Sequence, residues 1–429
     1  MWIKSTSILS LKKYLGFYLL IFILYIFFLP KTGFEPDIFF WKYWCAFIFR
    51  KGLYNIYNTR TDYLPMYHYI LMIFGFLMGS VKNIYKNIYY LKIITLIFDF
   101  ISGFFLIKLL IEKLKNSGKI FLKSLFYFLN IFVFYNSVIW GQIDGIIACF
   151  VFISFYYAYK KRILLSLVFF IIALNFKLQV IIFSPFIGLM ILPEMINQFN
   201  LKRIIQWIII PLIVQILIIL PFIFSGTLNN LWNVVLNSFG KFPLVSPNAY
   251  NIWSFVIHGN PAEVLDSQIV FGLSYKNWGS FLFFIASFVA LFPLIKFAFK
   301  SIKTKISSQF PIEKLLIIGS LIPLLFFYLN TEMHERYSHP AFIFLITYCI
   351  IKKKPLLGII ASVAYFLNLE DILHFLRLHN YGTLIFSRKF IASLYFITII
   401  LLFNDLYEIV VLRKIINKFT KFKDKPTVI

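Results

Sequence analysis

Acidic residues and cysteines are scarce in this chain of 429 residues. Asp and Glu number 17 against 42 Lys and Arg, and charged residues of both signs make up only 14%, where a soluble protein carries about 25%. So few charged side chains cannot cover a water-facing surface, which excludes a soluble enzyme and a disordered protein. The three cysteines (Cys45, Cys149 and Cys349) have no paired spacing, which excludes a disulfide scaffold and indicates no zinc site.

Hydrophobic residues are present in excess, at 61% of the sequence. This composition predicts an all-α polytopic membrane protein with a single multi-pass membrane domain over residues 1–429. The net charge of +25 would suggest nucleic acid in a soluble protein, but here the basic residues form short clusters between apolar segments, which is the positive-inside pattern. Membrane lipids are therefore expected as partners, and nucleic acid is not. The abundance of Ile, Phe, Lys and Asn favours a bacterial plasma membrane.

Apolar segments predict about 12 transmembrane helices (roughly 11–13), although several segments are shorter than the roughly 20 residues of a full span. The first is not a cleavable signal, because no small-residue cleavage site follows it. The segments lie at 14–30, 64–79, 91–111, 121–139, 143–159, 163–176, 178–193, 204–224, 281–298, 314–330, 340–351, 355–369 and 389–411.

The basic clusters predict the topology. All of them are cytoplasmic, with both termini cytoplasmic and twelve crossings, if segment 64–79 is partial or re-entrant. In the alternative, Lys82, Lys86 and Lys92 mark a cytoplasmic loop and one later segment does not cross. The clusters are Lys113 to Lys123, Lys160 to Arg162, Lys202 with Arg203, Lys296 to Lys305, Lys352 to Lys354, and Lys414 to Lys425, with Lys4, Lys12 and Lys13 before the first segment.

The loops that lack lysine clusters hold nearly all the polar motifs, so chemistry is expected on the non-cytoplasmic face. Two of them are long: the first external loop at 31–65, which carries acidic residues, and a long external loop at 225–280. The others lie at 140–144, 175–179 and 331–339.

The first external loop opens with Glu35, Pro36 and Asp37. Because proline disfavours helical geometry in the residue before it, we expect the two carboxylates to leave the membrane on an extended turn. Carboxylates at a bilayer boundary indicate function, while the alternative is that Asp37 caps the following helix. Aromatic residues then predict an interfacial amphipathic helix: Trp41, Tyr43 and Trp44.

Polar residues also interrupt the apolar segments at two turns. In the first, Trp140, Gln142 and Asp144 suit a ligand rich in hydroxyl groups, while the alternative is that Asp144 caps the next helix. In the second, Lys177 and Gln179 stand away from the cytoplasmic side, against the positive-inside trend. A phosphate ligand explains this lysine, and snorkelling to the headgroups is the alternative.

The most distinctive motif runs from His334 through Glu335 and Arg336 to Tyr337, between two apolar segments. Arginine pairs bidentately with phosphate oxygens, and histidine adds a hydrogen bond. The alternative is an ion pair of Arg336 with Glu335 or Glu332, shielded from lipid. Further polar residues that suit sugar hydroxyls, or ordinary turns and loop packing, are Asp62, Tyr63, Asn248 and Asn251.

Taken together, the motifs resemble the integral-membrane glycosyltransferases of the GT-C class. Most similar are bacterial mannosyltransferase-like proteins related to the eukaryotic enzyme that adds the second mannose to GPI anchors. The resemblance covers residues from about 33 to about 340, and WGQID and MHERY are its most specific motifs. It rests, in order, on the acidic motif after the first helix, Asp-Tyr-x-Pro, WGQID, the Lys-x-Gln turn, Asn-Ala-Tyr-Asn-x-Trp and MHERY.

The resemblance implies a GT-C fold and a polyprenyl phosphate sugar as the lipid-linked donor. One sugar, mannose or another hexose, would pass to a glycan, lipid or protein acceptor, with Asp37 as general base and Glu35 beside it. Arg336 and Lys177 would stabilise the leaving phosphate. The sequence leaves open a divalent metal ion held by Asp37, Glu35 and His334. It also leaves open a transporter of lipid-linked glycans or solutes, and a glycan polymerase or ligase.

Overall fold

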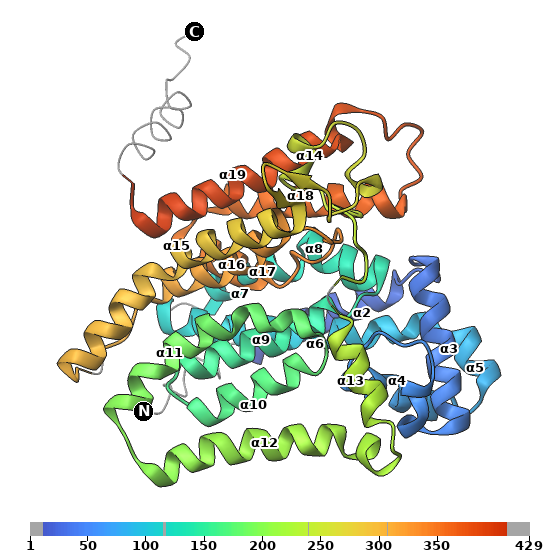
Figure 1. Ribbon diagram of the computed structural model, residues 1–429, viewed down its shortest axis with the longest axis horizontal. Coiled ribbons are helices and arrows are strands. Elements are labelled where there is room, and N and C mark those ends of the chain that lie inside the picture. The colour runs from blue at the N-terminus through green and yellow to red at the C-terminus, as the bar shows by residue number, and fades with distance from the viewer. Residues whose placement is uncertain (1–11, 115–116, 239, 307, 410–429) are drawn as a thin grey trace.

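The computed structural model describes residues 12–114, 117–238, 240–306 and 308–409 as a bundle of helices that run side by side (Figure 1). Lys4, the basic cluster Lys414 to Lys425 and both chain ends lie outside the described residues. The expected cytoplasmic placement of the termini therefore stays a prediction.

The bundle has two chemically different ends. One, called the loop end here, carries the segments 31–65, 140–144, 175–179, 225–280 and 331–339, whose side chains contact one another across the chain: Asp37 with Gln142, Asp62 with Lys241, and Lys177 and Arg336 with Asp144. At the other, called the lysine end, ion pairs join helix ends that are distant in sequence: Lys113–Glu313, Lys160–Glu112, Lys161–Glu194, Lys314–Glu408 and Lys354–Asp405.

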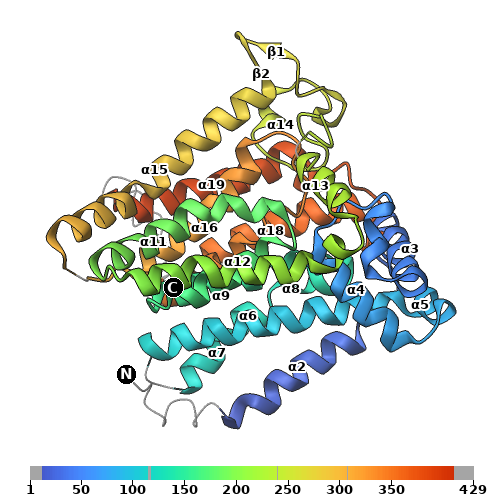
Figure 2. The ribbon, with the colours of Figure 1, turned by 60° about the horizontal axis from the view of Figure 1, so that its bottom comes forward.

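Successive long helices run in alternating directions between these ends (Figures 1 and 2). Those that run toward the loop end are α2 (Leu15–Phe27), α7 (Ser117–Phe128) with α8 (Ile131–Val133) and the π-helix η4 (Phe134–Trp140), α10 (Ile163–Leu174), α12 (Leu201–Phe224), α16 (Ile312–Leu329) and α18 (Pro355–Leu373). Those that run away from it are α6 (Lys92–Lys113), α9 (Asp144–Tyr159), α11 (Ser184–Asn197), α15 (Tyr275–Thr304), α17 (Ala341–Lys352) and α19 (Arg388–Tyr407).

Length and composition support a multi-pass membrane protein. Within the described residues, 7 helices are long and apolar enough to cross a bilayer, or 8 if the pair Ser117–Phe128 and Ile131–Trp140, bent by 43°, is one span. Four shorter apolar helices add to them: Pro65–Met78, Asp144–Tyr159, Ile163–Leu174 and Ala341–Lys352. The all-α polytopic class is confirmed at this level, while the number of about twelve crossings stays a prediction.

Burial separates the centre of the bundle from its outside. Almost every residue of α9, α16 and α17 is buried, as expected of helices that are apolar on all sides. Helix α12 is also apolar, yet most of its residues are exposed. An exposed apolar surface of this kind suits contact with lipid.

Three helices gather at the loop end (Figure 1). They are α3 (Glu35–Lys51), α4 (Pro65–Met78) and α5 (Val81–Asn87), with the 3₁₀ helices η2 (Leu53–Asn58) and η3 (Ile88–Leu91) between them. The 14 residues of α4 span only about 21 Å at 1.5 Å per residue, less than the roughly 30 Å of a hydrocarbon core. A partial segment at 64–79 agrees with this length.

Two expectations about this end are wrong. Glu35, Pro36 and Asp37 form the first turn of α3 rather than an extended turn, because proline is tolerated where a helix N–H has no partner. Lys92 cannot mark a cytoplasmic loop opposite the first external loop, because its Nζ lies 2.6 Å from the carbonyl oxygen of Thr32, within that loop.

The long loop at 225–280 carries short elements of its own. They are α13 (Leu228–Leu236), α14 (Trp253–Val256), the 3₁₀ helix η6 (Pro261–Glu263), and the antiparallel strands β1 (Ile269–Val270) and β2 (Leu273–Ser274). The 3₁₀ helices η1 (Lys12–Tyr14), η5 (Leu178–Phe183) and η7 (Leu384–Phe386) complete the described elements.

Candidate functional site

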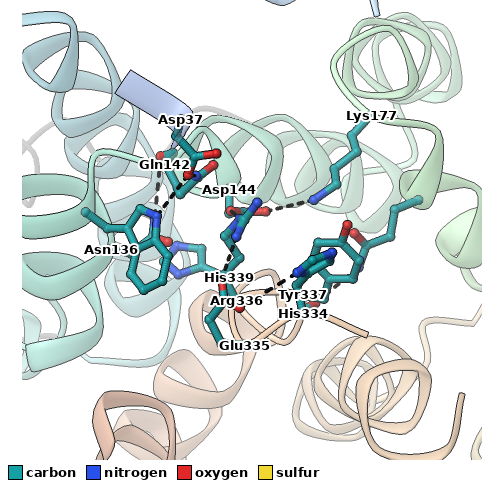
Figure 3. Close-up of polar contacts among 12 residues, drawn as sticks. Asp37, Asn136, Gln142, Asp144, Lys177, His334, Glu335, Arg336, Tyr337 and His339 are labelled. Carbon is teal, nitrogen blue, oxygen red and sulfur yellow. Dashed lines mark hydrogen bonds and ion pairs between the residues drawn. The ribbon is translucent and has the colours of Figure 1, made fainter. Parts of the chain in front are cut away.

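The turn after η4 is shaped by one glycine. Gly141 has a φ of 89°, a left-handed conformation that favours glycine. The backbone N–H groups of Gly141 and Gln142 both donate to the carbonyl oxygen of Asn136, at 2.8 and 3.1 Å. This tight turn brings Trp140 and Gln142 to the same side, where both donate to Asp37 (Figure 3).

Asp37 is a largely buried carboxylate with two neutral donors. Its Oδ2 accepts a hydrogen bond from Trp140 Nε1 at 3.1 Å and another from Gln142 Nε2. Burial raises the pKa of Asp37 above its ordinary value, against the opposing effects of the Arg336 charge and the Trp140 hydrogen bond. A carboxylate with a raised pKa in a cavity is a candidate general base.

Asp144 is the point where two cations converge (Figure 3). Lys177 Nζ lies 3.4 Å from Asp144 Oδ1, and Arg336 Nε lies 3.6 Å from Oδ2. The N-cap of α9 is Ile143, and Asp144 is the first residue within the helix, so Asp144 does not occupy the N-cap position. The Asp144 carboxylate thus links Lys177, in the turn at 175–179, to Arg336, in the motif from His334 to Tyr337 (called the HERY motif).

The HERY motif places an arginine between carboxylates. Arg336 Nη1 lies 2.5 Å from Glu335 Oε1, and Glu335 is fully buried. Burial alone would raise the pKa of Glu335, but the charge and hydrogen bond of Arg336, together with further favourable contacts, outweigh it and lower that pKa. Glu332 instead pairs with Lys276. The alternative ion pair with Glu335 is thus formed, and Arg336 lines a cavity as well.

A cavity of about 1940 Å³ opens beside these residues. At the loop end its wall carries Asp37, Lys177, His334 and Arg336. Away from the loop end the wall is almost wholly apolar and follows α11 and α15. Its apolar residues there include Leu189, Leu192, Phe283, Phe284, Phe288, Leu291, Ile295 and Phe299. The cavity therefore has a charged head and a long apolar arm.

Most of the other predicted site residues lie around this head. Those in the cavity wall are Asp62, Tyr63, Gln179, Asn248 and Tyr337. Asp62 pairs with Lys241, Gln179 Nε2 donates to the Tyr337 carbonyl oxygen at 3.2 Å, and Lys177 Nζ lies 3.9 Å from the centre of the Tyr337 ring. Trp140, Gln142, Asp144 and Glu335 lie behind the wall and contact residues that form it.

Two predicted residues are not brought into the cavity wall. Glu35 is exposed on the first turn of α3. Asn251 is buried, and its side chain donates to the carbonyl oxygen of Phe327 at 3.2 Å and accepts from the N–H of Trp253. It anchors the long loop to the end of α16, in agreement with the loop-packing interpretation.

The structure also reveals polar residues that sequence reasoning missed. Tyr365 donates to Asn136 Oδ1 at 3.0 Å and bonds to His339 Nδ1 at 3.0 Å. Asn368 Nδ2 donates to the Asn248 carbonyl oxygen at 2.9 Å. The sequence does contain a pattern that could have identified the polar residues of α18. Asn368, Glu370 and Asp371 interrupt an apolar helix, and polar residues in such a place indicate a role.

The described residues do not form a metal site of ordinary composition. Among them, no three His, Cys, Asp or Glu side chains come together as a metal ion would require. Asp37 and His334 share the cavity wall, whereas Glu35 does not.

No protein-family model matches the chain, and no curated protein shows significant similarity to it.

Proposed function

We propose that this protein is a GT-C type glycosyltransferase. It moves one hexose, such as mannose, from a polyprenyl phosphate sugar to an acceptor hydroxyl on the non-cytoplasmic face of the membrane. Asp37 is the general base. The observation that carries the proposal is the cavity, because it joins a carboxylate and two cations to a long apolar arm.

The apolar arm matches a lipid chain in length as well as in chemistry. Its wall on α15 runs from Ser280 to Phe299 and recurs at helical spacing, on one face. At 1.5 Å per residue, the distance along the helix from Ser280 to Phe299 is about 28 Å, close to the roughly 30 Å of a hydrocarbon core. A polyprenyl chain seated there would place its phosphate at the loop end, beside Arg336.

The head of the cavity suits a phosphate diester. Arg336 has donors to spare, because a guanidinium group has five N–H donors, and Nη1 is the one that donates to Glu335. Lys177 adds a second cation, although burial lowers the pKa of its ammonium group. Burial also lowers the pKa of His334 to about 4, so this imidazole is neutral and contributes a hydrogen bond rather than a charge.

The reaction is a single displacement. The acceptor oxygen attacks the anomeric carbon while Asp37 takes the hydroxyl proton. The bond from the anomeric carbon to the phosphate oxygen breaks, and its electron pair leaves on polyprenyl phosphate. Arg336 and Lys177 stabilise the charge that develops on that oxygen. The products are the glycosylated acceptor, polyprenyl phosphate and a proton that Asp37 later releases to water.

The arrangement of helices supports the GT-C part of the proposal. If every helix or broken helix that runs between the loop end and the lysine end crosses the bilayer, the chain crosses it twelve times and the loop end lies outside. The ion-paired lysines at the opposite end agree with a cytoplasmic face.

The test uses purified protein in liposomes with polyprenyl phosphate mannose or glucose. We expect one of these donors to lose its sugar to an acceptor, with release of polyprenyl phosphate. Translocation of the donor without a new glycosidic bond would identify a transporter. Use of preassembled lipid-linked oligosaccharides only would identify a polymerase or ligase. Either result would overturn the proposal.

A further inference from the structure

Lys92 is a fully buried lysine at the start of α6. Its Nζ is surrounded by four backbone carbonyl oxygens: Pro30 at 3.2 Å, Thr32 at 2.6 Å, Val138 at 3.0 Å and Ile139 at 2.7 Å. Among the described residues, no carboxylate lies within ion-pair distance of it. A lysine placed in this way is costly, because removing an ammonium group from water is unfavourable unless its donors are satisfied.

The four carbonyl groups compensate for that cost. An ammonium group has three N–H donors and no acceptor, so a shell made only of carbonyl oxygens suits it. Val138 and Ile139 are in the last turn of η4, where carbonyl groups have no partner within the helix and the helix dipole is negative. Lys92 therefore caps the C-terminal end of η4 from another helix.

The two segments that Lys92 joins are the two that carry the proposed base and its donors. Pro30 and Thr32 immediately precede the turn that holds Asp37, and Val138 and Ile139 immediately precede Trp140. The segments also pack directly: a Cβ atom on Gly33 would lie 3.1 Å from the carbonyl oxygen of Trp140. The contact of Asp37 with Trp140 and Gln142 thus spans the same junction that Lys92 closes.

The Lys92 stem extends this junction to the glycine of the turn. A Cβ atom on Gly141 would lie 2.7 Å from Lys92 Cγ and 2.9 Å from Cε. The left-handed turn that orients Gln142 is therefore packed against the same lysine. Lys92 therefore bonds to the backbone of both segments through Nζ and packs against the Gly141 turn through its stem.

We propose that Lys92 is a positioning residue that holds Trp140 and Gln142 against Asp37 by clamping the backbone of both segments. It does not line the cavity and touches no substrate in this account. Its catalytic effect rests on the proposed function, while its effect on the two segments does not.

The experiment compares Lys92→Met with Lys86→Met in the full-length protein. Methionine keeps the length and apolar stem but has no N–H donor, and Lys86 is an exposed lysine of α5 that serves as the control. Hydrogen–deuterium exchange without substrate is the first readout. We expect faster exchange in residues 30–37 and 138–142 of the Lys92 variant, with the lysine end unchanged.

Kinetics supply the second readout. A misplaced base costs roughly tenfold to a hundredfold in kcat, so kcat of Lys92→Met should fall by this factor while the donor KM stays near the wild-type value. The acidic limb of the pH–rate profile should also move to higher pH, because the hydrogen bond from Trp140 favours the Asp37 anion. A purely structural role would lower the yield of folded protein without moving that limb.

The outcomes separate the two proposals. Unchanged exchange in both segments, or wild-type kcat and pH profile in a protein that transfers sugar, would overturn the positioning role. If no wild-type transfer is found with any donor, the proposed function fails and the exchange data still decide the role of Lys92. If Lys92→Met does not fold, the same measurements are made on Lys92→Arg, which keeps the charge but whose planar group fits the four carbonyl groups poorly. We expect the same changes in smaller degree.

Discussion

At the scale of single residues, Asp37 is a carboxylate in a place that disfavours its charge. Burial raises its pKa, so the folded protein binds this proton more tightly than the unfolded chain does. Such a group favours folding at low pH, and this contribution is lost as the pH rises through the folded-state pKa. Its ionised form at neutral pH therefore costs stability, as is common for functional carboxylates.

We therefore predict that Asp37→Asn does not lower the melting temperature at neutral pH and raises it if anything. The asparagine oxygen still accepts from Trp140 and Gln142, and it carries no buried charge. The difference from wild type should shrink as the pH falls from the raised folded-state pKa of Asp37 toward the ordinary range for aspartate, and it should stay constant below that range. Melting curves in detergent at several pH values measure this. A clear loss of stability at pH 7 would show that the charge of Asp37 stabilises the fold.

The pH dependence of transfer gives a second prediction. A general base acts only when ionised, so kcat/KM should fall as the pH drops through a pKa above the usual aspartate range. Trp140→Phe removes one hydrogen bond to the anion, and the acidic limb should move further to higher pH. Trp278→Phe is the control, because it also removes an indole hydrogen bond, here to the Val270 carbonyl oxygen in the long loop. A limb that stays in place, or moves to lower pH, would contradict this assignment.

Arg336 gives the third prediction. Lysine cannot reproduce the fork of a guanidinium group, and a lost charge-assisted hydrogen bond is worth about 1.5–3 kcal/mol. Arg336→Lys should therefore weaken donor affinity by roughly ten- to more than a hundredfold, as measured by titration with the identified donor. Arg388→Lys is the control, because Arg388 stacks on Tyr250 outside the cavity. If Arg336→Lys leaves the donor affinity unchanged and lowers the stability of the folded protein, Arg336 is only a structural partner of Glu335.

The sequence predicted these residues because they break an apolar background. Asp37, Lys177 and Arg336 each stand out where lipid would penalise them, and all three lie in the cavity wall. The role of Lys92 could not be foreseen, because its partners are backbone carbonyl groups, which every residue has. Without the family resemblance, the sequence does not separate the role of Glu35 from that of Asp37. Only the direction of the first turn of α3 separates an exposed carboxylate from one that faces the cavity.

At the scale of elements, the apolar arm along α11 and α15 contains a position where a substitution can reduce the volume of the arm. Gly188 lies in α11 and in the cavity wall, and a Cβ atom there would meet no atom within 4 Å. A large side chain can thus fill the arm without disturbing the packing of the helix. Gly16 in α2 also has open space around it but lies outside the cavity wall, which makes it a matched control.

We predict that Gly188→Phe raises the KM for a long-chain donor by about tenfold, which corresponds to roughly 1.4 kcal/mol of lost binding. Displacing two or three CH₂ groups is sufficient, at about 0.8 kcal/mol each. A donor with a short, soluble chain should be used with nearly unchanged KM, and Gly16→Phe should affect neither donor. Equal effects on long and short donors would place the lipid chain elsewhere.

The elements were easier to predict than their breaks. Long apolar runs predicted α6, α12 and α19 to within a few residues, because hydrophobicity sets the length of a span, whereas α15 extends beyond the predicted segment 281–298 at both ends. The segment 121–139 was expected as one helix, but it is bent by 43° and ends in a π-helix. Asn130 explains the break, because its side chain accepts from the N–H of Phe132 and caps a new helix. A single asparagine within an apolar segment is not sufficient to predict such a cap from the sequence.

At the scale of the whole molecule, polar chemistry and ion-paired lysines lie at opposite ends of one bundle. The grouping of loops 31–65, 140–144, 175–179, 225–280 and 331–339 at one end was predicted from charge alone, and their contacts bear it out. Which membrane face each end occupies is a consequence of the positive-inside rule and stays a prediction. The cavity could not be predicted, because it forms between helices that are distant in sequence.

The most direct test of the central claim is the balance of products in a single reaction. Wild-type protein in liposomes receives a polyprenyl phosphate sugar labelled in both sugar and lipid, and the new glycoside and the released polyprenyl phosphate are counted. We predict one polyprenyl phosphate for each sugar transferred, near-complete loss of both products in Asp37→Asn, and retention of both in Glu35→Gln, because Glu35 is exposed outside the cavity wall. Transfer by Asp37→Asn at a rate close to wild type would contradict the account.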